Sequence, residues 1–189
     1  QHPTQALLDL YTIFEELGRD HNRLNRLRIA MVGDLRYGRT VHSLSKLLSL
    51  FKKVHFSFIS PRELKMPPEI VERCREAGHE VHETHELYAG VADAEVIYVT
   101  RVQQERFTDE EEAERFRGRF VINDTVYEKY CRPDAVLMHP LPRDSRAGAQ
   151  ELSTELDNNP NLAIFRQTDN GIPIRMAIFA LVMGVEERV

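Results

Sequence analysis

The stretch "LRIAMVGDLRYGRTVHSL", Leu27 to Leu44, decides the fold. Its first six residues are apolar apart from Arg28, which predicts a strand buried on both faces. Its last part continues as "TVHSLSKLLSLF" from Thr40, with apolar residues at helical spacing. A buried strand that leads directly into a helix predicts one unit of a parallel α/β sheet. The polar turn from Gly33 to Arg39 then lies at the carboxyl end of the strand.

The same alternation of strand and helix continues along the chain. Helical patterns such as "PPEIVERCREAG" separate further short apolar runs, and "EVHET", Glu80–Thr84, is a weaker candidate for an edge strand. We therefore expect a doubly wound α/β fold, with a mostly parallel five-stranded sheet and helices on both faces. The further strand candidates are "VHFSFIS" (54–60), "AEVIYVT" (94–100), "RFVIN" (119–123) and "DAVLMH" (134–139).

Both ends of the chain carry helical patterns. Apolar residues recur at intervals of three and four after Pro3 and stop at Gly18, which predicts an amphipathic helix. The final segment "IPIRMAIFALVMGV" is apolar nearly all round, which predicts burial on more than one side, or an exposed apolar surface where a covering partner is absent. The polar stretch from Arg143 to Pro160 is interpreted as a mobile loop.

Composition excludes several classes of function. The chain has 189 residues, 42% of them apolar, and a net charge of -5, which favours one globular domain and disfavours general binding to nucleic acid or anionic membranes. Its two cysteines, Cys74 and Cys131, lack metal-like spacing, so we expect free thiols and a cytoplasmic location. No apolar run reaches the roughly 20 residues of a membrane span. The chain begins with Gln1 rather than Met, and we expect it to be a fragment.

Polar residues follow three of the predicted strands. These segments are "GDLRYGRT" (33–40), "TRVQQER" (100–106) and "HPLPR" (139–143). Ligands of open α/β sheets bind outside the carboxyl ends of the strands, and the arginine fork suits carboxylate or phosphate. We therefore expect a site for a small anion, although each arginine alone is as consistent with a solvated surface residue. A nucleotide is poorly supported, because neither G-x-G-x-x-G nor a lysine-containing phosphate loop occurs.

Several long motifs together resemble one family, the aspartate carbamoyltransferases. These motifs occur in the order of the family: "HPTQALLDLYTI" from His2, "GDLRYGRTVHSL" from Gly33, "YVTRVQQERF" from Tyr98, "MHPLPR" from Met138 and "FRQTDNGIPIRMAIFALVMGV" from Phe165. The family transfers the carbamoyl group of carbamoyl phosphate to L-aspartate in the cytoplasm, for pyrimidine synthesis. The resemblance covers only the second half of a family catalytic chain.

The resemblance implies a division of the chain into three parts. Residues 1–18 correspond to an interdomain helix, residues 19–170 to the aspartate-binding α/β domain, and residues 171–189 to a helix that packs on the N-terminal carbamoyl phosphate domain. That N-terminal domain, which holds the phosphate with a Ser-Thr-Arg-Thr turn, is not in this sequence. We therefore expect little activity from the chain alone. Family members form homotrimers, and trimerisation of this chain alone is doubtful for the same reason.

The resemblance also assigns roles to individual residues. Arg39 and Arg101 hold the two carboxylates of aspartate, and Gln103 supports that pocket. A desolvated dicarboxylate independently requires two separate cationic forks on rigid strand ends. His2 and Gln5, which share a helix face, contact the carbamoyl group: His2 donates to its oxygen and Gln5 accepts from its NH2.

The "HPLP" motif is expected to leave backbone carbonyls free at the rim of the site. Pro140 and Pro142 lack a backbone N–H and restrict the residue before them, so the motif does not continue a helix or a central strand. The family has a cis peptide here, so we expect Leu141–Pro142 to be cis. The Pro140 and Leu141 carbonyls then line the rim with Arg39 and Arg101.

The expected reaction needs no metal, organic cofactor or protein nucleophile, because the amine of aspartate attacks an already activated carbon and phosphate leaves. Two alternatives stay open. Ornithine carbamoyltransferases have a similar fold, but their later motif reads His-Cys-Leu-Pro, and ornithine needs an acidic partner for its ammonium group. The chain is also consistent with a non-catalytic or isolated domain that binds dicarboxylates.

Overall fold

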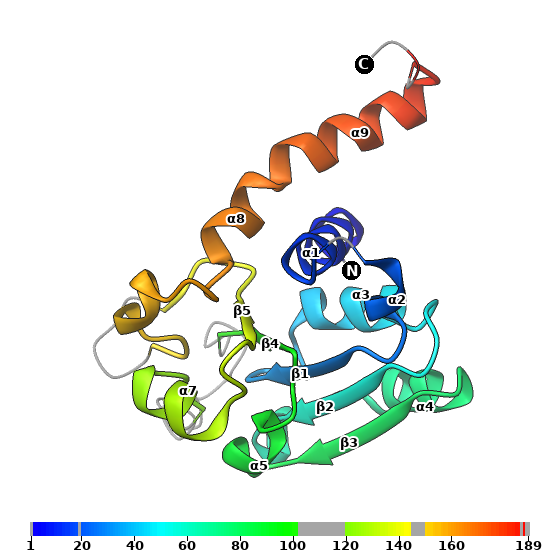
Figure 1. The fold of residues 1–189 in the computed structure, drawn as a ribbon. Coiled ribbons are helices and arrows are strands. Elements are labelled where there is room, and N and C mark those ends of the chain that lie inside the picture. Colours follow the sequence, from blue (N-terminus) through cyan, green and yellow to red (C-terminus); the bar gives the residue numbers. More distant parts are fainter. Residues whose placement is uncertain (1, 19, 102–119, 145–149, 186, 188–189) are drawn as a thin grey trace.

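The computed structural model of the chain describes residues 2–18, 20–101, 120–144, 150–185 and 187. In it, five parallel strands form one sheet in the order β3-β2-β1-β4-β5 (Figure 1). The strands are β1 (Arg28–Val32), β2 (His55–Ile59), β3 (Glu80–Thr84), β4 (Val96–Val99) and β5 (Val136–Met138). The predicted α/β class and five-stranded sheet are confirmed, and the sheet is parallel throughout.

The sheet reverses its winding direction between β1 and β4. From β1 the chain builds outward through β2 to β3, then returns to add β4 and β5 on the other side of β1. The two strand ends approach closely at Gly33, where φ is 113° and a Cβ would lie 2.2 Å from the carbonyl oxygen of Thr100. Only glycine fits this position without a clash. The carboxyl ends of β1 and β4 therefore form the topological switch point where α/β sheets bind ligands.

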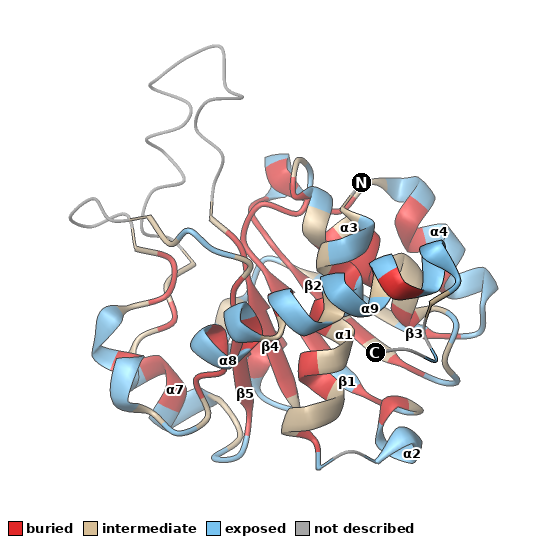
Figure 2. Cartoon of the chain, turned by 90° about the horizontal axis from the view of Figure 1, so that it is seen from above, coloured by how far each residue is buried: buried red, intermediate tan, exposed pale blue. Residues whose placement is uncertain are grey.

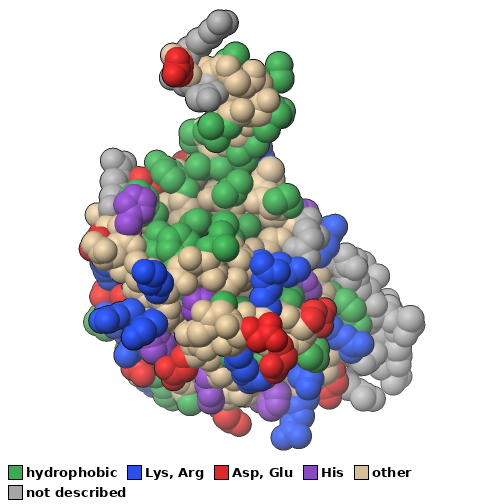
Figure 3. All heavy atoms as spheres, turned by 90° about the vertical axis from the view of Figure 1, so that its right-hand side faces the viewer, with side chains coloured by type: hydrophobic (Ala, Val, Ile, Leu, Met, Phe, Trp, Pro, Cys, Tyr) green, Lys and Arg blue, Asp and Glu red, His purple; other side chains and the backbone are tan. Residues whose placement is uncertain are grey.

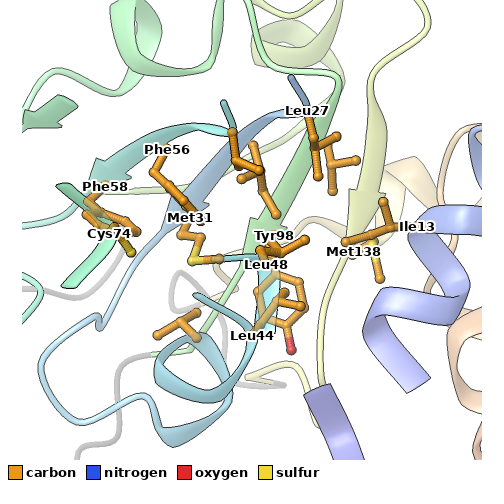
Figure 4. Close-up of a cluster of buried hydrophobic side chains, with 14 of the residues drawn as sticks. Ile13, Leu27, Met31, Leu44, Leu48, Phe56, Phe58, Cys74, Tyr98 and Met138 are labelled. Carbon is orange, nitrogen blue, oxygen red and sulfur yellow. The ribbon is translucent and has the colours of Figure 1, made fainter. Parts of the chain in front are cut away.

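Helices cover both faces of the sheet (Figures 1 and 2). One face packs against α1 (Pro3–Glu16), α2 (His21–Leu24), α3 (Arg39–Leu48) and α4 (Pro68–Glu76). The other packs against α5 (Leu87–Val91) and α7 (Asp124–Tyr130). The remaining helical segments are the 3-10 helices η1 (Arg62–Leu64) and η3 (Thr154–Asn158), then α8 (Ile164–Asp169) and α9 (Gly171–Met183). Figure 4 shows the hydrophobic core between the sheet and the helices α1 to α4, in which Ile13 of α1 and Leu44 of α3 lie with Tyr98 of β4.

Two local predictions are wrong. "RFVIN" is no strand in its described part, residues 120–123, because Ile122 forms only a single bridge with Leu152. The side chain of Asn123 then caps α7 by accepting a hydrogen bond from the backbone N–H of Val126, which ends the extended segment. The second wrong prediction is the loop after Arg143, because this stretch contains η3, whose Leu156 is buried.

The weaker candidate "EVHET" supplies the fifth strand, β3, at the edge predicted for it.

The last helix, α9, extends away from the body of the molecule and exposes its apolar side chains (Figures 1 and 3). Only Gly171 and Ala180 of this helix are buried, whereas Phe179 is 71% and Val182 is 77% exposed. The other large exposed apolar residues of α9 are Ile172, Met176, Leu181 and Met183. The predicted exposed apolar surface is therefore confirmed.

Two predictions from composition are also tested by the structure. Cys74 and Cys131 are free thiols, and burial raises the pKa of each to about 11, so both stay protonated at neutral pH. Within the described ranges, none of the helices combines the length and apolar character required to cross a membrane.

Candidate active site

A pocket of about 270 Å³ lies at the switch point between β1 and β4. Four segments far apart in the sequence meet there: the start of α1, the turn after β1, the end of β4 and the segment after β5. The lining residues are His2, Gly38, Arg39, Thr40, Thr100, Arg101, His139, Pro140, Leu141 and Pro142. Six of the eight predicted site residues thus line one pocket.

The turn after β1 directs Arg39 into this pocket. Asp34 is buried, and its side chain accepts a hydrogen bond from the backbone N–H of Tyr37 at 2.9 Å, which holds the turn. Gly38 is the N-cap of α3, and a Cβ at this position would lie 2.5 Å from the carbonyl oxygen of Asp34. The other arginine of the turn, Arg36, donates to the carbonyl of Glu63 at 3.3 Å and does not line the pocket.

The N-terminus of α3 adds to the positive potential of the pocket. Arg39 is the first residue of this ten-residue helix, and no side chain caps the helix start. Exposed backbone N–H groups at a helix N-terminus favour a negatively charged ligand. The Arg39 guanidinium and the N-terminus of α3 therefore both favour a negatively charged ligand in the pocket.

The end of β4 contributes Arg101. The hydroxyl of Thr100 donates to the carbonyl of Val32 at 3.2 Å, which ties the end of β4 to the end of β1. Arg101 follows directly, is half-buried and lines the pocket together with Arg39. Gln103, predicted to support the same pocket, lies outside the described residues.

His2, the N-cap of α1, and Gln5, in the first turn of α1, line two adjoining pockets. His2 lines the first pocket, and its backbone N–H donates to the hydroxyl of Ser43 at 2.8 Å, which joins α1 to α3. Burial, and then the positive charge of Arg39, lower the pKa of His2, so its imidazole is neutral at pH 7. Gln5 lines a second pocket of about 150 Å³, which shares His139, Pro140 and Leu141 with the first.

Hydrogen bonds of the His139 ring and of the His139 backbone hold the "HPLP" segment in place. The Leu141–Pro142 peptide bond is cis, as predicted. The Nδ1 atom of buried His139 accepts from the backbone N–H of Leu141 at 2.9 Å, so Nε2 carries the proton that is donated to Glu151 at 2.7 Å. The backbone N–H of His139 donates to the Oε1 atom of Gln167 at 3.0 Å. His139 therefore connects this segment to Glu151 and Gln167 through hydrogen bonds.

A buried carboxyl group, Asp9, was not predicted from the sequence. Its Oδ1 accepts from the amides of Gln167 at 2.6 Å and Gln5 at 2.8 Å, and its Oδ2 accepts from the Tyr98 hydroxyl at 2.7 Å. Burial raises the pKa of Asp9 to about 6, although the three hydrogen bonds oppose this rise. One signal was available: Asp9 lies four residues after Gln5, on the helix face that carries the apolar residues.

These groups together suit a dianionic small molecule. Two arginines and a helix start supply positive charge, and Pro140, Leu141 and Pro142 of the "HPLP" segment line the same pocket. In the parts of the chain that the structure describes, no three His, Cys, Asp or Glu side chains are placed to hold a metal ion. The fold and pocket thus define a doubly wound α/β domain with a positively charged pocket at its switch point, which suits a small polar anion.

The family model for the aspartate/ornithine carbamoyltransferase Asp/Orn binding domain matches residues 25–182. The chain belongs to this family of carbamoyltransferases and contains its Asp/Orn binding domain. The matched range contains Arg39, Arg101 and the "HPLP" segment, whereas His2 and Gln5 precede it.

Individual relatives agree with this assignment. The aspartate carbamoyltransferase catalytic subunit of Cellvibrio japonicus is 56% identical over 189 residues, which are the whole of this chain and 56% of that protein. The catalytic subunit of M. jannaschii aspartate transcarbamoylase has a TM-score of 0.84 at 43% identity, over 98% of this chain and 57% of that one. Aspartate transcarbamoylase from Trypanosoma cruzi, solved with carbamoyl aspartate and phosphate, has a TM-score of 0.78 at 37% identity, over 95% and 53%. The chain spans about half the length of these relatives.

Proposed function

We propose that this chain is the aspartate-binding half of an aspartate carbamoyltransferase. The enzyme transfers the carbamoyl group of carbamoyl phosphate to the amine of L-aspartate and releases N-carbamoyl-L-aspartate and phosphate. One observation carries the proposal: Arg39 and Arg101 line a single pocket at the ends of adjacent strands. Aspartate has two carboxylates, and each guanidinium binds one of them through a bidentate, charge-assisted pair.

The reaction then depends on positioning and on charge stabilisation. With both carboxylates held, the amine of aspartate faces the Pro140 and Leu141 carbonyls, which accept its hydrogen bonds and direct its lone pair at the carbamoyl carbon. Negative charge grows on the carbamoyl oxygen as the bond to the amine forms. The neutral imidazole of His2 donates a hydrogen bond to that oxygen, and Gln5 accepts from the carbamoyl NH2.

The charge of the pocket favours aspartate over ornithine. Among its described lining residues there is no Asp or Glu, whereas two are arginines. The side-chain ammonium group of ornithine would meet Arg101 without an acidic partner, which disfavours binding. The family as a whole covers both substrates, so this charge is the observation that selects one of them.

In this proposal, the first and last helices of the chain contact the part of the enzyme that residues 1–189 do not include. The exposed apolar side chains of α9 are covered by the part of the relatives that this chain does not span, and α1 connects the two halves. Without that part, carbamoyl phosphate lacks half of its site, so residues 1–189 alone show negligible turnover and bind aspartate at best in the millimolar range. Assembly of the complete enzyme as a homotrimer and a cytoplasmic location remain predictions.

The test compares residues 1–189 with a completed chain, in which they are joined to the part of the Cellvibrio japonicus subunit that they do not cover. We expect the completed chain to form carbamoyl aspartate from carbamoyl phosphate and L-aspartate, and to reject L-ornithine. Turnover of ornithine would contradict the proposal. Aspartate binding without turnover would instead favour the non-catalytic dicarboxylate-binding domain.

A further inference from the structure

Asp9 fixes which way two glutamine side chains point. Its Oδ1 atom lies 2.8 Å from the amide nitrogen of Gln5 and 2.6 Å from that of Gln167. A carboxylate offers only acceptors, so each glutamine turns its NH2 group toward Asp9 and its carbonyl oxygen elsewhere. A neutral amide at position 9 would permit either orientation.

The consequence for Gln167 is visible in the structure. Its carbonyl oxygen accepts the backbone N–H of His139 at 3.0 Å, at the start of the "HPLP" segment. Asp9 on α1 thus fixes, through Gln167 on α8, the backbone that presents the Pro140 and Leu141 carbonyls. The same logic leaves the carbonyl end of Gln5 as the acceptor in the 150 Å³ pocket, which Pro140 and Leu141 also line.

The third partner keeps Asp9 in its accepting form. Burial, and then the charge of Asp9, raise the pKa of Tyr98 well above its ordinary value, so the hydroxyl keeps its proton and donates it to Oδ2 at 2.7 Å. Figure 4 shows the Tyr98 ring inside the apolar core, with its hydroxyl oxygen at the far end. All three hydrogen bonds to Asp9 therefore come from donors, which suits the ionised carboxylate.

We propose that Asp9 is a positioning residue of this site, which holds Gln5 as a hydrogen-bond acceptor and, through Gln167, fixes the backbone carbonyls of Pro140 and Leu141. The proposal rests on the proposed function, because it concerns the contacts of the carbamoyl group and the attacking amine. A contribution to the stability of the fold does not explain why a carboxylate occupies position 9. Burying a carboxylate is unfavourable, and the raised pKa of Asp9 reflects that cost.

The experiment is a double-mutant cycle in the completed chain, with Asp9→Asn, Gln5→Ala and their combination. If Asp9 acts through Gln5, Asp9→Asn lowers kcat about tenfold or more, with KM for aspartate changed less than about twofold. In the Gln5→Ala background the same change lowers kcat several-fold less. Asp169→Asn, the same chemical change on the exposed surface of α8, leaves kcat within about twofold of the parent. Equal loss from Asp9→Asn in both backgrounds would overturn the action of Asp9 through Gln5, and no loss in either background would overturn the proposal as a whole.

A second variant covers the case in which Asp9→Asn does not fold. Gln5 is only half-buried, and Gln5→Glu keeps an acceptor while it removes the donor to Asp9. We expect kcat to fall about threefold or more, because two carboxylates repel each other at this distance. An unchanged kcat would overturn the proposal.

The hydrogen bonds from Gln5 and Gln167 to Asp9 can also be tested without measuring enzyme turnover. In residues 1–189, the side-chain amide protons of Gln5 and Gln167 exchange slowly with solvent when Asp9 holds them, and Asp9→Asn accelerates both exchanges. An inactive completed chain with these protected amides would count against the proposed function alone. Unprotected amides in the parent chain would overturn the role of Asp9.

Discussion

The raised pKa of Asp9 makes the stability of this domain depend on pH in a way that one substitution removes. Folding raises the pKa of this carboxyl from 3.8 to about 6, chiefly through burial. Between these two values the folded chain holds a proton that the unfolded chain releases. The contribution of Asp9 to the free energy of unfolding is therefore fully present below pH 3.8 and is lost as the pH rises through 6.

The magnitude follows from the shift. About two pKa units at 1.36 kcal/mol each give a total change of about 3 kcal/mol, of which about 1.4 kcal/mol falls between pH 5 and pH 7.5. Asn at position 9 does not titrate. The difference in unfolding free energy, parent minus Asp9→Asn, is thus expected to decrease by about 1.4 kcal/mol from pH 5 to pH 7.5.

Urea unfolding of residues 1–189 and of Asp9→Asn, followed by circular dichroism at both pH values, measures this difference. The other titratable groups are common to both chains, so their contributions cancel to first order. A difference that stays constant within a few tenths of a kcal/mol would show that Asp9 is not a buried carboxyl with a raised pKa, and the reasoning about its environment would fail.

Further predictions concern the pocket, the strand ends and the last helix. Arg101→Ala lowers kcat/KM for aspartate in the completed chain by about tenfold or more, since a charge-assisted pair contributes about 1.5 to 3 kcal/mol, whereas Arg36→Ala leaves it within about twofold. Equal losses would indicate nonspecific binding. Gly33→Ala places a Cβ against Thr100 and lowers the unfolding free energy by more than about 2 kcal/mol, in contrast to about 1 kcal/mol for Gly18→Ala, where a Cβ meets nothing within 4 Å. Comparable urea midpoints for the two variants would contradict this. The exposed apolar side chains of α9 are expected to make residues 1–189 self-associate, and Phe179→Ser, which changes a side chain that is 71% exposed, is expected to reduce that association in sedimentation velocity. A parent chain that stays strictly monomeric would count against the role assigned to α9.

The sequence was most informative where structure is determined locally. The strand at 28–32 and the helix that follows it share one continuous pattern, and Arg39 lies at their junction, so its place at the rim could be predicted. "RFVIN" misled because apolar composition does not reveal whether a neighbouring strand is available, and Asn123 ends the segment after one bridge.

The supporting network could not be predicted in the same way. Asp9, Tyr98 and Gln167 come from α1, β4 and α8, and only the tertiary fold brings them within hydrogen-bond distance. The sequence shows Asp9 as one acidic residue in an amphipathic helix, where a solvated position is the usual outcome. The contact of His139 with Glu151 could not be predicted for the same reason, since it joins the "HPLP" segment to a buried residue within the stretch that was interpreted as a loop.

The most direct test of the central claim is a crystal structure of the completed chain with N-carbamoyl-L-aspartate. We expect one carboxylate of this ligand on the guanidinium of Arg39 and the other on that of Arg101, with the carbamoyl group against His2 and the Leu141 carbonyl. A ligand bound elsewhere, or held in this pocket with its carboxylates away from both arginines, would contradict the claim.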